Sequence, residues 1–288
     1  MKTRIISAVI MIAVVIGILF AGYKYNANII IYFISLLAVA ATYEILHTIV
    51  KSGTAFRKAV ACLYAMAAYF SASDILSGAY DVLIKDKAID EKYLSLSVSV
   101  FVLSSIIYFT IITLSLIYSK NEFDVKEILA LIGVPFVYSA AFATLNCIIT
   151  RPQGIYYLLL VINFSSVSDT GAYFTGVMFG KHKLCERVSP KKTVEGAIGG
   201  VVLSLIVTVV LVRLFKVPAN VFVMLAVTVV MCIVGMLGDL FASVLKRSVG
   251  VKDYSNLIPG HGGILDRFDS MLFISPAVLS LMLLGVIK

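Results

Sequence analysis

Long runs of apolar residues, separated by short polar segments, make up most of this chain. Runs of about 17–25 apolar residues are long enough to cross the hydrocarbon core of a bilayer as α-helices. The pattern predicts nine such helices, at residues 5–21, 27–48, 59–76, 94–118, 128–149, 154–180, 194–215, 219–245 and 264–287. We therefore expect an all-α fold, a polytopic membrane bundle of about nine transmembrane helices.

Ionisable residues within these spans are concentrated late in the chain. We therefore divide the chain into three regions. Residues 1–92 would contain the N-terminal membrane spans, about three helices, and residues 93–153 the middle spans. Residues 154–288 would form a C-terminal catalytic membrane region that carries the motifs. Ionisable side chains are costly inside a bilayer and commonly mark function there, so the site is expected in this last part.

The composition supports a lipid environment. Of the 288 residues, 60% are hydrophobic and 14% are charged, whereas about 25% are charged in a typical soluble protein. There is too little polar material to cover a soluble core of this size. The net charge of +8 is typical of basic cytoplasmic loops and of phosphate sites, and we expect no nucleic-acid partner.

The distribution of basic residues predicts the orientation. With the N-terminus in the cytoplasm, two thirds of the 24 Lys and Arg residues fall on the cytoplasmic side, as the positive-inside rule requires. The C-terminus is then external to the cell membrane. The two most polar loops, 179–193 and 246–263, both face the cytoplasm, where nucleotides are available.

The first polar group lies at the end of the sixth predicted span. Asp169 is inside the span, and Tyr173 follows one helical turn later on the same face. Lys181 and Lys183 come directly after the span. These residues are candidates for substrate binding. The alternative is a helix-packing surface with lysines that extend toward the membrane interface.

The second polar group precedes the seventh predicted span. We interpret Ser189-Pro190 as a turn, followed by Lys191, Lys192 and Thr193 just before a helix begins. A helix N-terminus offers unpaired N–H groups and a positive partial charge, which suit an anionic substrate. The alternative is an ordinary basic cytoplasmic loop.

The third polar group is the richest in chemistry. Asp239 and Ser243 share one helical face, and Asp266 and Asp269 lie at the start of the last span. Between them stands a Pro-Gly-His-Gly-Gly segment whose backbone can approach a phosphate closely. The remaining candidates in this group are Lys246, Arg247, Lys252, His261, Gly262, Gly263 and Arg267. His261 either donates a hydrogen bond to phosphate or is a turn residue. A structural ion-pair network is the alternative for the whole group.

Carboxylates from two helices, surrounded by cations, suggest metal-assisted phosphoryl chemistry. Carboxylate oxygens suit Mg²⁺, which proteins usually hold through one or two carboxylates together with substrate phosphates. Nearby cations would offset negative charge on a leaving group. A second, monovalent cation is a further possibility that the residues leave open.

These groups resemble the phosphatidate cytidylyltransferase family. The family signature places Ser and Lys-Arg before Lys-Asp, then Pro-x-His-Gly-Gly and Asp-Arg-apolar-Asp, and every fixed position is met between Ser243 and Asp269. The blocks D-T-G-A-Y-F, F-G-K-H-K-L and S-P-K-K-T-x-E-G upstream are also similar, so the likeness covers roughly residues 165–270. One departure is Ala242, where many relatives carry a polar or acidic residue; the departure could alter the surroundings of Asp239.

The resemblance implies the function. It implies an enzyme that joins CTP to phosphatidic acid, forming CDP-diacylglycerol and pyrophosphate, with Asp239 and Asp266 as the Mg²⁺ ligands in a cytoplasm-facing cavity. It also implies a bundle of about nine spans that forms a homodimer. The alternatives are a related membrane lipid kinase, another lipid cytidylyltransferase, or, in a different class, an ion or solute transporter. A transporter would show inverted repeats with broken helices in both halves.

Overall fold

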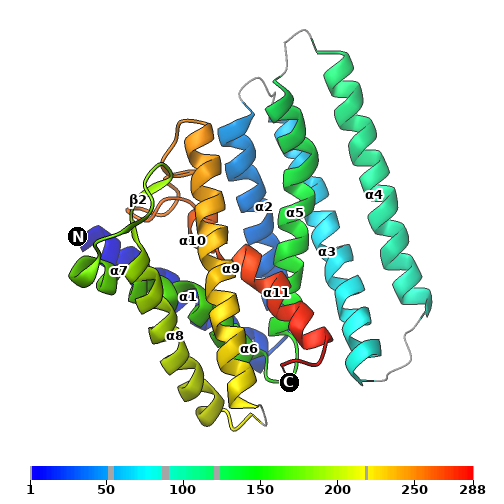
Figure 1. The fold of residues 1–288 in the computed structure, drawn as a ribbon. Helices are drawn as coiled ribbons and strands as arrows, with labels where there is room; N and C mark the ends of the chain where they lie inside the picture. The colour runs from blue at the N-terminus through cyan, green and yellow to red at the C-terminus, as the bar shows by residue number, and fades with distance from the viewer. Residues whose placement is uncertain (1, 51–54, 86–90, 120–123, 218–219, 288) are drawn as a thin grey trace. The chain divides into compact units, whose positions relative to one another are not determined.

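Helices make up almost all of the described structure. The computed structural model describes residues 2–50, 55–85, 91–119, 124–217 and 220–287. The chain forms two units, of which the first comprises residues 1–147 and 253–267 and the second residues 148–252 and 268–288. Figure 1 shows the ribbon coloured along the chain, with most of its helices labelled. The predicted all-α fold class is confirmed.

The first unit is built from the long N-terminal helices. They are α1 (Lys2–Lys24), α2 (Asn28–Ile49), α3 (Ala55–Lys85), α4 (Glu91–Ile117) and α5 (Val125–Ile149), joined later by the first residues of α10 (Leu265–Phe268). Helix α2 packs against α1 and α3, and α3 packs against α4. In the core, the rings of Tyr64 and Tyr108 stack with their centroids 4.3 Å apart, next to buried Leu46 and Leu131.

The second unit combines helices with one short hairpin. Its elements are α6 (Gly154–Ile162), the π-helical turn η1 (Asn163–Val167), α7 (Ser168–Phe179), β1 (Lys183–Cys185), β2 (Ser189–Thr193), α8 (Val194–Leu214), α9 (Val221–Ser248) and α11 (Met271–Leu283). Helix α8 packs against α7 and α9, and α9 packs against α11. The two strands pair antiparallel.

Buried polar side chains hold the middle of the second unit together. The Asn163 side-chain amide donates to the carbonyl of Ser204 at 3.1 Å and to Thr208 Oγ1 at 3.0 Å. The hydroxyls of Thr208 and Thr228 lie 2.8 Å apart, which extends the chain of contacts from η1 through α8 to α9. In an apolar surrounding, such bonds satisfy groups that would otherwise be costly to bury.

Seven helices are long and apolar enough to span a membrane among the residues that the structure describes: α1, α2, α3, α4, α5, α8 and α9. The predicted count of nine is not confirmed. The predicted span 154–180 is divided by the π turn of η1, and the predicted span 264–287 is interrupted after α10. Helix α11 has 13 residues and is about 20 Å long, whereas the hydrocarbon core of a bilayer is about 30 Å thick.

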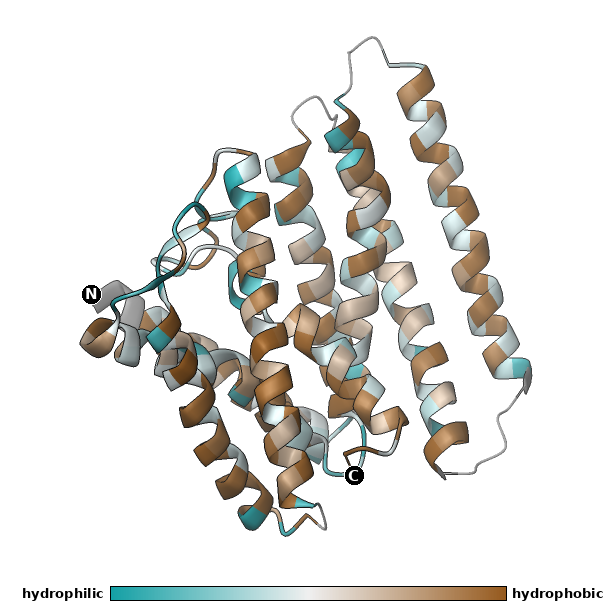
Figure 2. Ribbon diagram, in the orientation of Figure 1, coloured by the Kyte–Doolittle hydropathy of each residue, from teal (hydrophilic) through white to brown (hydrophobic). Residues whose placement is uncertain are grey.

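Within each unit, hydrophobic and hydrophilic residues occupy different parts of the helices. Figure 2 shows the long helices covered mostly by hydrophobic residues, while hydrophilic residues gather at helix ends and along the hairpin. Helix α4 illustrates the outward apolar face: Leu96, Leu103 and Ile106 are each more than half exposed. These exposed apolar faces are suited to lipid rather than to water.

Candidate active site

The β-hairpin of the second unit positions the basic residues of the second polar group. The predicted turn at Ser189-Pro190 is wrong: both residues begin β2, and the turn lies at residues 186–188. The hairpin runs directly into α8, where Thr193 is the N-cap and its Oγ1 accepts a hydrogen bond from the Gly196 N–H at 3.1 Å. The strand therefore delivers Lys191 and Lys192 to the start of α8, as the sequence predicts.

Glu195, in the first turn of α8, fixes the segment between α7 and the hairpin. Its carboxylate accepts hydrogen bonds from the backbone N–H groups of Lys181 at 3.1 Å and His182 at 3.2 Å. The His182 ring Nδ1 lies 2.5 Å from the same carboxylate. A carboxylate at this end of a helix is also favoured by the helix dipole.

A cavity of about 580 Å³ lies between α7, the hairpin and α9. Eight of the residues predicted to form the site line this cavity, and they are Asp169, Tyr173, Lys183, Ser189, Lys191, Lys192, Thr193 and Asp239. The structure thus brings the first two polar groups of the sequence together with Asp239 of the third. Acidic and basic side chains face one space, which is the arrangement that a metal-bound polyphosphate requires.

Three carboxylates and two lysines form a charge network in the second unit. Lys192 Nζ forms an ion pair with Asp239 Oδ2, and Lys246 Nζ lies 3.9 Å from Asp269 Oδ2. The Asp269 carboxylate, whose side chain is 11% exposed, is also within electrostatic range of Asp239 and Asp169. Carboxylates that repel one another are stabilised by cations placed between them, whether these are lysines or a bound metal.

A second group of predicted residues lies in the first unit, in what we call the glycine loop (residues 254–264). Asp266 is buried, and its Oδ2 accepts hydrogen bonds from the backbone N–H groups of Tyr254 and Gly263, each at 2.9 Å. Gly262 has a φ of +84°, and a Cβ there would lie 2.8 Å from Asp266 Oδ2. The glycines therefore allow the loop to close tightly around this carboxylate.

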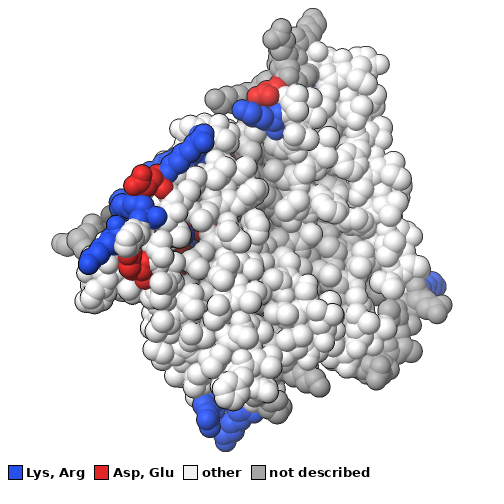
Figure 3. Space-filling view, viewed as in Figure 1, with Lys and Arg blue, Asp and Glu red and all other residues white. Residues whose placement is uncertain are grey.

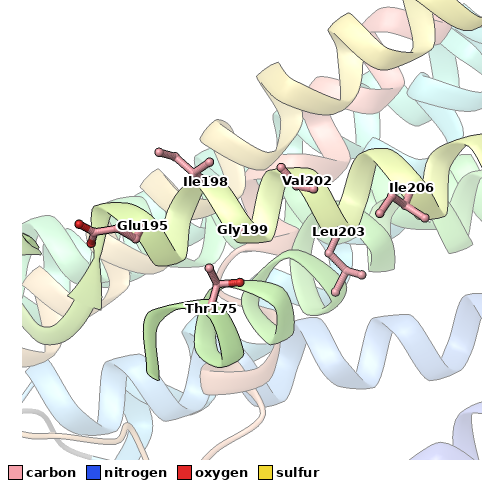
Figure 4. Close-up of a pocket in the computed structure, with 7 residues that line it drawn as sticks. All are labelled: Thr175, Glu195, Ile198, Gly199, Val202, Leu203 and Ile206. Carbon is pink, nitrogen blue, oxygen red and sulfur yellow. The ribbon is translucent and has the colours of Figure 1, made fainter. Parts of the chain in front are cut away.

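A separate groove runs along α8 beside α7. Its volume is about 450 Å³, and it is lined by Thr175, Glu195, Ile198, Gly199, Val202, Leu203 and Ile206 (Figure 4). None of these seven described residues is a Lys or Arg, so the groove has no cation for a phosphate. On the face shown in Figure 3, charged side chains likewise form a few small groups within a broad uncharged surface.

Comparison with known proteins identifies the family. The model of the cytidylyltransferase family matches residues 2–284 of the chain. The chain belongs to this family. Two similar proteins are the phosphatidate cytidylyltransferases of Staphylococcus haemolyticus (strain JCSC1435), 42% identical over 181 residues, and of Staphylococcus aureus (strain COL), 41% identical over 186 residues. These alignments cover 60% and 62% of the chain, and 66% and 68% of the two relatives. The predicted family is confirmed, as is its enzyme class, a nucleotidyltransferase.

The other predicted site residues lie outside the cavity lining. Ser243 follows Asp239 on α9 by one turn, and Arg247 Nη1 donates to the Val251 carbonyl at 3.2 Å. Lys181, Lys252 and Arg267 are exposed, whereas Gly262 and Gly263 are buried. The chain is a multi-pass membrane protein, because seven helices within its described residues are long and apolar enough to cross a bilayer and its family is a membrane enzyme family.

The metal prediction concerns residues of both units. Asp239 belongs to the second unit and Asp266 to the first, so their pairing stays a prediction. Among the residues that the structure describes, no group of three or more His, Cys, Asp and Glu side chains is arranged to hold a metal ion. The donors nevertheless suit Mg²⁺, because one or two carboxylates suffice where substrate phosphates supply the other ligands.

Sequence reasoning missed the side chains that anchor the glycine loop. Glu44 on α2 binds the loop backbone, Thr48 Oγ1 donates to the Tyr254 carbonyl at 3.1 Å, and Ser7 Oγ donates to the Pro259 carbonyl at 3.0 Å. Ser7 Oγ also lies 2.9 Å from His261 Nδ1. Only Glu44 carries a signal in the sequence, since it is a carboxylate within an apolar span.

Proposed function

We propose that the chain transfers the cytidylyl group of CTP to phosphatidic acid, producing CDP-diacylglycerol and pyrophosphate. The names of the relatives support this reaction. The observation that carries it is the cavity in which Lys183, Lys191 and Lys192 face the carboxylates of Asp169 and Asp239. A nucleoside triphosphate needs cations for its phosphates, and its metal ion needs carboxylates, so both are required at one place.

The lysines and the start of α8 would bind the phosphates. Lys191 is exposed and lines the cavity next to the N-cap residue Thr193. The N-terminal turn of α8 adds the positive end of a 21-residue helix, which attracts anions. The nucleotide would therefore lie with its phosphates at the hairpin.

The reaction is an in-line displacement at phosphorus. A phosphate oxygen of the lipid attacks the α-phosphorus of CTP, the new P–O bond forms, and the bond between the α-phosphorus and its bridging oxygen to the β-phosphorus breaks. Pyrophosphate leaves with that electron pair. Because a phosphate monoester is already ionised near neutral pH, no strong general base is needed. The chain's own contribution is then positioning and charge stabilisation.

Mg²⁺ is part of the proposal. Asp239 and Asp266 would hold it, and Asp269 would lie close to Asp239 in the charge network. When bound, the ion would neutralise phosphate charge as a Lewis acid. Lys246, beside Asp269, would balance the carboxylates. We also propose that a second, monovalent cation binds, that the protein forms a homodimer, and that the cavity opens to the cytoplasm.

The test is cytidylyl transfer by the purified protein in detergent with phosphatidic acid and Mg²⁺. CTP labelled at the α-phosphate should transfer its label to lipid, whereas CTP labelled at the γ-phosphate should not. Label from the γ-phosphate alone would instead indicate a lipid kinase. Asp239→Asn is the control and should lose at least about tenfold in rate, which is about 1.4 kcal/mol. Absence of α-label in lipid, with several lipid phosphates tried, would refute the function.

A further inference from the structure

Glu44 connects two ends of the glycine loop through one buried carboxylate. It lies on α2 and is 5% exposed. Its Oε1 accepts hydrogen bonds from Ser255 Oγ at 2.7 Å and from the Ile264 N–H at 3.0 Å. Its Oε2 accepts from the Leu265 N–H at 2.9 Å. One side chain thus binds Ser255 near the beginning of the loop, Ile264 at its end and Leu265 directly after it.

The loop backbone lies between two carboxylates. Glu44 accepts from Ile264 and Leu265, where α10 begins, and Asp266 accepts from Tyr254 and Gly263. A Cβ at Gly263 would lie 2.7 Å from Glu44 Oε1, so the glycine is needed for this approach. If Glu44 releases the loop, the N–H groups that orient Asp266 move with it.

We propose that Glu44 is a positioning residue for cytidylyl transfer, because it fixes the glycine loop and thereby the orientation of the Asp266 carboxylate. The inference rests on the proposed function, in which Asp266 serves the metal and the reacting phosphates. All three of the contacts described above are donated to Glu44, so both of its side-chain oxygens act as hydrogen-bond acceptors.

Glu44→Gln keeps the size and shape of the side chain and tests whether both of its oxygens must accept hydrogen bonds. The amide turns an NH₂ group toward a donor, which leaves a buried N–H or hydroxyl without an acceptor. Since Glu44 would act through the orientation of Asp266, the expected loss is in kcat, about tenfold, with both KM values within about twofold of the unaltered protein. The matched control is Asp74→Asn on α3, a carboxylate of the same unit that accepts from Ser97 Oγ at 3.3 Å. This variant should keep its kcat.

Hydrogen exchange measured by mass spectrometry gives a readout that does not depend on activity. In Glu44→Gln without substrates, the peptide that contains Ile264 and Leu265 should exchange at least about threefold faster, while peptides from α3 keep their rates. Unchanged exchange in the loop, or a kcat within about threefold of the unaltered protein, would overturn the proposal.

A second variant is needed if Glu44→Gln raises hydrogen exchange throughout the first unit. Ser255→Ala removes one of the three donors and should raise exchange in the loop alone, with a smaller fall in kcat and unchanged KM. Failure of either effect would then overturn the proposal. If the unaltered protein transfers no cytidylyl group, the proposed function fails, whereas the exchange comparison still judges whether Glu44 holds the loop.

Discussion

At the scale of single residues, the two adjacent lysines of β2 have different surroundings. Lys192 forms an ion pair with Asp239, and its side chain is 26% exposed. Lys191 lines the same cavity but is exposed. The two lysines therefore differ in the ion pair with Asp239 and in exposure, although both line the cavity.

This difference predicts that replacing the two lysines changes different kinetic constants. Lys191→Ala should raise the KM for CTP about fivefold to tenfold and leave kcat nearly unchanged. The contact that it removes would bind the phosphate equally well in the ground state and in the transition state. Lys192→Ala should lower kcat by at least about tenfold, because it also removes the cation that neutralises Asp239. Steady-state kinetics with both substrates varied will measure both. A pure KM effect in Lys192→Ala would contradict this division of roles.

At the scale of elements, glycines set the distance between α7 and α8. Gly200 faces the backbone of Ser168, and a Cβ at this position would lie 2.5 Å from the Ser168 carbonyl oxygen. A Cβ at Gly171 would lie 3.0 Å from the Gly200 Cα. Small residues at such positions allow membrane helices to pack closely, and here the packing holds one wall of the cavity.

Gly200→Ala should therefore destabilise the second unit. The added methyl group has to push α7 and α8 apart, and overpacking of this kind costs about 1–3 kcal/mol. Gly17→Ala on α1 is the matched control, since a Cβ at Gly17 meets nothing within 4 Å and alanine favours helix by up to about 1 kcal/mol. Thermal unfolding in detergent should show a lower Tm only for Gly200→Ala. Equal Tm values for both variants would show that this close approach does not matter.

The sequence predicts some elements well and others poorly, for physical reasons. Apolar runs predict the seven long helices, and the N-cap position of Thr193 agrees with the predicted helix start. The hairpin is not predicted, because strands of three and five residues are too short to carry a periodic apolar pattern. The π turn at residues 163–167 is also missed, since it depends on contacts with α8 that lie far away in the sequence.

The candidate site shows the same limit. Asp169, Lys192 and Asp239 could be selected from the sequence because charge is rare near apolar spans. Their grouping around one cavity required the fold. Glu44 was visible as a carboxylate in a span, but its partners are backbone N–H groups, which every residue except proline has. No pattern of side chains points to them.

At the scale of the whole molecule, the basic residues predict which side of the membrane each loop faces. Single cysteines at Lys181 and Leu257, in a protein without the four native cysteines, should both react with an impermeant maleimide only from the cytoplasmic side. Leu257 lies in the glycine loop and is 61% exposed, so a cysteine there would be accessible to the reagent. Labelling of the two positions from opposite sides would contradict the orientation and a single cytoplasmic cavity.

The order of the chain has a consequence for its biosynthesis. Glu44 and its donor Leu265 are 221 residues apart, although both belong to the first unit. At a translation rate of about 5–20 residues per second, α2 is complete at least about ten seconds before the glycine loop exists. Until then a carboxylate in an apolar span lacks the N–H groups that it binds in the finished protein. A carboxyl group without partners is costly to keep inside a membrane span, so the contacts of Glu44 are completed only when residue 265 has been made.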